Sequence, residues 1–252
     1  MICIIRTEFM KLRRFYVLLI GMIGMAFPAI LSVFTQTVTI PEAQIQDFNF
    51  TVLFNHTIWN SATTFMPVIF TLIGGFLINR EYKDDTLKNI FTIPISFHKL
   101  VLGKLIVMGI ISILFGFYSF IVTLIVGFIT GINGLNPTVL RNSFLQMTGI
   151  SICTYISVLP IIAFTCRKRD AFMGGVVVSF LFGYSSMFIK DVTLRSLYPI
   201  LSGLTIIRFD TRTYMNTAES GNLSISVLTM AAILLFTGKL ILMPYSGKAS
   251  YT

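Results

Sequence analysis

Residues 105–132 read LIVMGIISILFGFYSFIVTLIVGFITGI, a run without any Asp, Glu, Lys or Arg. A helix rises about 1.5 Å per residue, so this run can cross the ~30 Å hydrocarbon core of a bilayer. In lipid the backbone must satisfy its own hydrogen bonds, as an uninterrupted helix does. Five further stretches share this character, and only Lys239 interrupts one of them: 15–34, 59–78, 143–166, 171–189 and 223–243. The sequence therefore predicts an all-α membrane protein with six transmembrane helices.

Composition supports a single transmembrane domain covering residues 1–252. Hydrophobic residues make up 55% of the chain and charged residues 12%, which is typical of membrane proteins. The six predicted spans take up more than half of the chain, so no room remains for a soluble catalytic domain.

The charges predict the orientation. If the N-terminus lies in the cytoplasm, most of the 19 Lys and Arg residues fall in inside segments, whereas the acidic residues divide evenly between the two sides. This positive-inside bias places both termini in the cytoplasm. The net charge of +9 is explained by anionic headgroups, so we expect no nucleic-acid partner.

Residues 1–14 resemble an amphipathic helix lying in the cytoplasmic interface. Ile2, Ile5, Phe9 and Leu12 recur at helical spacing among basic residues. A plain basic anchor for the first span is the alternative.

Two segments are predicted on the outside. In the first, 35–58, aromatic residues gather towards the end, and they form either an interfacial aromatic belt or a surface for an amphipathic substrate: Phe48, Phe50, Phe54 and Trp59. In the second, 190–222, leucines recur at helical spacing and predict one or two short helices at the outer leaflet.

The longest cytoplasmic loop, 79–104, contains a short amphipathic helix. Asp84 or Asp85 can cap it, Leu87, Ile90 and Phe91 share one face, and Pro94 ends it. Such a helix either docks into a partner's groove or packs against its own bundle.

Several kinds of chemistry are absent from the sequence. The spans contain no Asp, Glu or His, which argues against a proton- or sodium-driven carrier. The metalloprotease, serine-hydrolase and phosphate-loop motifs H-E-x-x-H, G-x-S-x-G and G-x-x-x-x-G-K-[ST] do not occur. We therefore expect no catalytic residue, metal or cofactor in this chain, and if ATP drives the protein, another chain binds it.

The loop resembles that of the ABC-2 type transporter permeases, which carry a glutamate after the second span and then a threonine, a proline and a lysine. Here these are Glu81, Thr86, Pro94 and Lys104. Asp85 stands where the family often has glycine. The interfacial N-terminal helix, the six spans and the long outside segment are similar too.

The resemblance implies partners. A second permease chain, identical or related, would complete a dimer, and each half would dock a separate ATPase subunit that binds ATP and Mg²⁺. The loop would then couple the two subunits through Glu81, Asp84, Asp85, Thr86, Leu87, Lys88, Ile90, Phe91, Pro94 and Lys104.

The chain looks most like the permeases that remove bacitracin or lantibiotic peptides from the bacterial plasma membrane as self-protection. An ABC-2 permease for a drug, a lipid or sodium, and a membrane immunity protein that does not transport, are alternatives, as is, more remotely, a membrane-bound enzyme. Candidate residues for the substrate path are Phe48, Phe54, Trp59, Thr63, Tyr118 and Tyr184.

Overall fold

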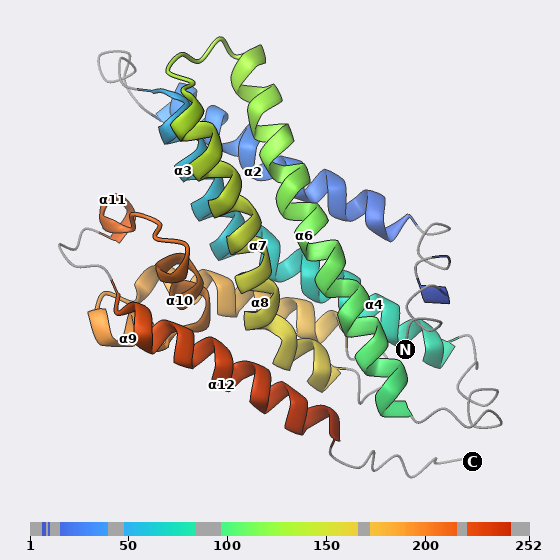
Figure 1. Ribbon diagram of the computed structural model, residues 1–252. Coiled ribbons are helices and arrows are strands. Elements are labelled where there is room, and N and C mark those ends of the chain that lie inside the picture. The colour runs from blue at the N-terminus through green and yellow to red at the C-terminus, as the bar shows by residue number, and fades with distance from the viewer. Residues whose placement is uncertain are drawn as a thin grey trace.

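The computed structural model describes residues 7, 8, 10, 16–39, 48–83, 97–165, 172–215 and 221–242, and every regular element within these ranges is a helix (Figure 1). The prediction of an all-α protein is thus confirmed for the described residues. The long helices are α2 (Val17–Thr39), α3 (Phe50–Asn60), α4 (Met66–Lys83), α6 (Phe97–Ile129), α7 (Pro137–Thr165), α8 (Phe172–Ser185) and α12 (Leu223–Leu242). The short ones are the π-helix η2 (Ser61–Phe65), the 3₁₀ turn η3 (Ser186–Phe188), α9 (Val192–Leu197), α10 (Pro199–Ile206) and α11 (Arg212–Met215).

Five apolar helices within the described ranges are long enough to cross a membrane. They cover Val17–Val38, Phe50–Arg80, Lys99–Ile129, Pro137–Thr165 and Leu223–Leu242. The predicted span at 171–189 corresponds to a shorter apolar helix, Phe172–Phe188.

The assignment of residues 35–58 to a loop is wrong for Phe50–Ile58, which form most of α3. Asn49 caps this helix, because its side-chain oxygen accepts a hydrogen bond from Val52 N at 3.1 Å. Phe50, Leu53 and Phe54 are buried along one face. Polar residues flank this apolar face on both sides, at Asn49, Asn55 and His56, so the sequence was interpreted as a loop. α3 continues through η2 into α4 as one long helix.

Three other helices extend beyond the predicted spans. α6 begins at Phe97 rather than 105 and ends before 132, α7 begins at Pro137 rather than 143, and α2 continues to Thr39 rather than 34. At α6 and α7 the prediction followed charge-free runs, but a helix can continue past the hydrocarbon core wherever its charged side chains reach water or a partner. The extension of α2 contains no charge but is polar, with Thr35, Gln36 and Thr37.

In the segment 190–222, the described residues form three short helices where one or two were predicted. Asp191 caps α9 by accepting from Thr193 N at 2.8 Å and Leu194 N at 3.2 Å. Pro199 then starts α10, as the residue before a proline is disfavoured in a helix. α10 is buried through Ile200, Leu201 and Leu204, and it packs between α7 and α12.

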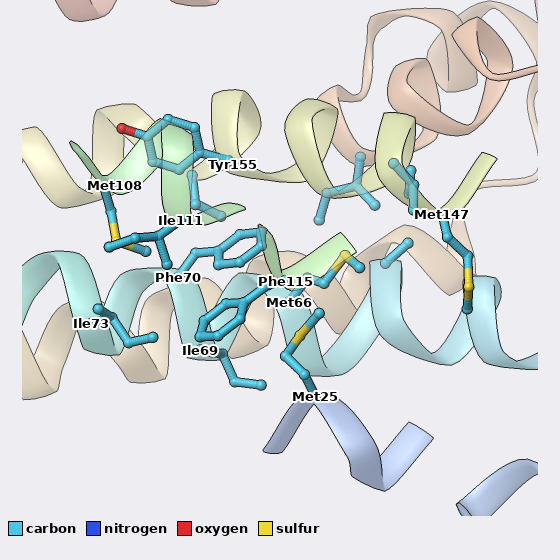
Figure 2. Packing of buried hydrophobic residues seen from close by; sticks show 14 of the residues in the cluster. Met25, Met66, Ile69, Phe70, Ile73, Met108, Ile111, Phe115, Met147 and Tyr155 are labelled. Carbon is cyan, nitrogen blue, oxygen red and sulfur yellow. The ribbon is translucent and has the colours of Figure 1, made fainter. Parts of the chain in front are cut away.

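The core lies around α4, which contacts α2, α6, α7 and α8. Figure 2 shows Met66, Ile69, Phe70 and Ile73 of α4 among side chains from the neighbouring helices. Phe70 stacks on Phe115 of α6, with ring centroids 6.4 Å apart.

Glycine allows a close helix crossing between α4 and α2. A Cβ on Gly24 of α2 would lie 2.8 Å from Ile69 Cδ1. Small residues at such crossings let transmembrane helices approach closely, which gives dispersion contacts in place of a hydrophobic driving force.

The bundle has two distinct ends (Figure 1). We call one the loop end, where α4 ends at Lys83 and α6 begins at Phe97; the first residue of α2 and the last of α12 also lie there. We call the other the turn end, where residues 130–136 join α6 to α7 and where α9, α10 and α11 gather.

Candidate functional site

A buried ion pair lies at the loop end. Lys104 Nζ is 2.7 Å from Glu8 Oε2, and it also donates a hydrogen bond to the Leu77 carbonyl oxygen at 3.1 Å. Both charged side chains are only 2% exposed. The contact joins three parts of the chain: the N-terminal segment, the last turns of α4 and the first turns of α6.

Because both side chains are buried, each of the two charges depends on the other for its stability. Two charges removed from water lose much hydration energy, which their attraction and added hydrogen bonds can offset only while both are present. The Leu77 carbonyl supplies such an added bond.

The other predicted coupling residues are described less fully. Asp84, Asp85, Thr86, Leu87, Lys88, Ile90, Phe91 and Pro94 lie outside the described residues, and so does the side chain of Glu81, whose backbone is in the last turn of α4. Lys104 points inward and contacts Glu8 and the Leu77 carbonyl of its own chain, and its part in coupling stays a prediction. Glu8, its partner, was not predicted, although it is the single acidic residue in 1–14.

The six predicted substrate-path residues are spread over several elements. Three are buried (Phe54, Trp59 and Thr63), two are half-buried (Phe48 and Tyr118), and Tyr184 is exposed on α8. Phe54 stacks on Phe120 of α6 with centroids 5.5 Å apart, so it packs in the core. Phe48 lines a cavity of about 480 Å³ at the turn end, together with residues of α2 and of the α6–α7 turn.

Thr63 belongs to the π-helical turn η2. Its hydroxyl donates a hydrogen bond to the Trp59 carbonyl at 2.8 Å. This bond gives the carbonyl a partner at the turn where the regular α-helical hydrogen-bond pattern is interrupted. Gly183 of α8 lies against this turn so closely that a Cβ there would meet the Thr63 carbonyl oxygen. The wide turn is therefore also the place where α8 crosses the long helix.

Trp59 lies in an aromatic cluster at the turn end. It stacks on Tyr214 with ring centroids 4.8 Å apart, Phe209 stacks on Tyr214 at 5.8 Å, and His56 contacts Tyr214 edge-on at 5.3 Å. Burial raises the pKa of the Tyr214 phenol. This cluster fastens the segment around α11 onto α3.

No group of three His, Cys, Asp or Glu residues within the described ranges is placed to hold a metal ion.

Comparison with known proteins gives two matches. A family model described as ABC-2 family transporter protein matches residues 4–186, from the N-terminal segment to the end of α8. The chain is also similar to the "Bacitracin transport permease protein BCRB" of Bacillus licheniformis, with 28% identity over 131 residues. That match covers 52% of this chain and 62% of the relative, so it spans less than two thirds of the relative's length. No solved structure matches the chain.

Proposed function

Because the chain belongs to the ABC-2 family of transporter proteins, we propose that it is the membrane permease of an ATP-driven exporter that removes amphipathic peptide antibiotics from the membrane. A transporter permease in the cell membrane, with several passes, follows from the family itself. The observation that carries the finer proposal is the similarity to a bacitracin transport permease. ATP hydrolysis belongs to a separate subunit in this proposal.

The proposal includes six spans with both termini in the cytoplasm. The sixth span is Phe172–Phe188, whose 17 residues rise about 26 Å. A slightly short span is tolerated by local thinning of the bilayer. Exposed apolar side chains around this helix support lipid contact: Met173, Val177, Val178, Phe180, Leu181 and Phe188. The loop end is then the cytoplasmic end, in agreement with the positive-inside bias.

Coupling is proposed to act through residues 84–96. This loop joins α4 to α6, and both helices pack directly against α7. A push on the loop by an ATPase would therefore reach the bundle as a movement of packed helices, since close-packed cores shift as units. A second permease chain would complete the assembly.

In this proposal the substrate path is formed by the six aromatic and hydroxyl residues predicted from the sequence. Phe48 supports it best among the six, because it lines an open cavity with Gln36 and Asn49, where apolar and amide groups lie together. An amphipathic peptide presents the same two kinds of group.

The test uses the tagged full chain purified from its own host membranes. We expect an ABC ATPase to co-purify, and the complex in lipid vesicles to hydrolyse ATP faster when bacitracin is added. The chain with Leu87→Asp and Phe91→Asp should insert normally but lose the ATPase. A chain that alone hydrolyses ATP, or an ATPase that remains bound to this variant at full yield, would contradict the proposal.

A further inference from the structure

A second cavity at the turn end is lined by charged side chains, which the described lining of the Phe48 cavity does not include. Its volume is about 360 Å³, and it lies between the end of α10 and the start of α12, lined by Thr205, Arg208, Phe209, Asp210, Thr211, Arg212, Gly221 and Leu223. Leu223 is the first residue of α12. The cavity therefore opens where a membrane-spanning helix begins.

Arg208 has a backbone conformation that is unusual for its residue type. Its φ of 54° lies in the left-handed region, and it is the one non-glycine residue with positive φ among the described residues. It reverses the chain after α10, where Phe209 N donates to the Leu204 carbonyl and Arg208 N to the Thr205 carbonyl, both at 3.0 Å. Glycine usually occupies this position because it has no Cβ.

Packing does not explain why an arginine stands here. The need to bury Phe209 explains the chain reversal, but the Arg208 side chain is exposed. Its guanidinium has no hydrogen-bond or ion-pair partner among the described residues. A strained backbone with an unengaged functional group is the kind of outlier that points to a binding role.

The described residues that line the cavity carry a net positive charge, from Arg208, Arg212 and Asp210. Arg212 is engaged by Asp210 through Nε–Oδ1 at 3.0 Å and Nη2–Oδ2 at 3.2 Å. These bonds lower the pKa of the Asp210 carboxyl, which stays ionised and neutralises Arg212. Among the described lining residues, no carboxylate is then left to balance the charge of Arg208, which lies next to the hydroxyl groups of Thr205 and Thr211.

We propose that this cavity binds the phosphate of an anionic lipid headgroup, with Arg208 as its main contact. A guanidinium presents a fork of N–H donors that fits phosphate oxygens, and threonine hydroxyls add further donors. A lipid is favoured over a free anion because α12 continues from the cavity with an exposed apolar face, formed by Leu223, Val227 and Leu228, along which an acyl chain can lie. The proposal rests on α12 being a membrane span, and it is independent of cargo and ATPase.

The test measures lipid binding to the purified full chain in detergent by native mass spectrometry. The probes are dioctanoyl phosphatidylglycerol, dioctanoyl phosphatidylcholine and inorganic phosphate. We expect the wild-type chain to prefer phosphatidylglycerol, and Arg208→Gly and Arg208→Gln each to weaken its binding about tenfold or more, as loss of a charge-assisted contact does.

The glycine variant separates binding from folding. Glycine adopts the left-handed conformation freely, so Arg208→Gly should keep or raise the thermal midpoint measured without lipid. Arg141→Gln is the matched control, because Arg141 is an exposed cation on the first turns of α7 outside the cavity. It should bind phosphatidylglycerol like the wild type.

Three results would overturn the proposal: phosphatidylglycerol binding unchanged in both Arg208 variants, phosphatidylcholine bound equally well, or inorganic phosphate bound as tightly as the lipid. None of these measurements involves an ATPase or a peptide. The lipid site and the exporter function can therefore fail separately.

Discussion

The two ends of the bundle are held together in different ways. At the loop end, a buried ion pair between Glu8 and Lys104 joins three segments. At the turn end, three stacked rings (Trp59, Phe209 and Tyr214) and the His56 ring against Tyr214 hold α11 against α3, and the nearby charged pair Asp210–Arg212 is open to solvent. A buried pair fails when either partner is lost, whereas a ring cluster loses its contacts one at a time. One substitution at the loop end should therefore cause most of the possible loss of stability there. At the turn end, each substitution should remove only part of it.

The largest expected effect tests the loop end. Lys104→Met removes the ammonium group that the buried Glu8 carboxylate contacts, and it should cost about 3–5 kcal/mol of unfolding free energy. Adding Glu8→Gln in the same chain should restore much of this loss, because neither side chain of the pair is then charged. A double-mutant cycle on the thermal stability of the purified chain gives the coupling. If the stability losses of the two single substitutions simply add in the double mutant, the two charges do not depend on each other.

The second prediction concerns the crossing of α8 with the π-helical turn. A Cβ at Gly183 would meet backbone atoms of Thr63, which cannot move aside like a side-chain tip. Gly183→Ala should destabilise the chain by about 1–3 kcal/mol, as overpacking does. Gly174→Ala, on the same helix with nothing within 4 Å of the added Cβ, is the control and should be neutral or mildly stabilising. Equal melting temperatures for the two variants would mean that the crossing is not tight.

A smaller effect is expected from the ring cluster. Tyr214→Leu removes one stacked ring while Trp59 and Phe209 remain, with centroids 6.5 Å apart. The loss should be about 1 kcal/mol, since an aromatic pair contributes roughly 0.5–1.5 kcal/mol beyond its buried area. Tyr214→Phe keeps the ring and should melt like the wild type. If Tyr214→Leu unfolded the chain as severely as Lys104→Met, the contrast between the two ends would disappear.

The smallest effect comes from pH. Hydrogen bonds from Arg212 lower the pKa of Asp210, so the pair adds stability above the carboxyl's unfolded pKa and loses it as pH falls through the lower folded value. Both side chains are more than half exposed, which limits the gain. Asp210→Asn should thus be slightly less stable at neutral pH, and the difference should vanish in acid. A difference that persists at low pH would assign it to something other than this charge pair.

The apolar helices were predictable because crossing a lipid bilayer requires a long stretch of sequence with few or no charged residues. A run such as 105–132 carries no charge, and its position and helical form are confirmed apart from its ends. The start of α3 was missed because Asn49, Asn55 and His56 looked like a loop, although Asn49 is the helix cap. The polarity of a stretch does not show which side chain will accept a hydrogen bond from a backbone N–H.

Contacts between distant residues set the other limit. Glu8 and Lys104 are 96 positions apart, and neither residue alone indicates the other. The left-handed backbone at Arg208 follows from the burial of Phe209 against Tyr214, which only the assembled fold provides. By contrast, the Glu81, Thr86, Pro94 and Lys104 pattern indicated the family correctly from sequence alone.

The wide turn at Ser61–Phe65 has a consequence for how the long helix can change over evolutionary time. A π turn accommodates one more residue than the α ladder, and each residue rotates a helix by about 100°. The phase of α3 is thereby offset from that of α4. Loss of one residue here would rotate α3 and so change the direction of Phe50 and Phe54, while α4 stays in place. The packing face of α3 could therefore change without a change in that of α4.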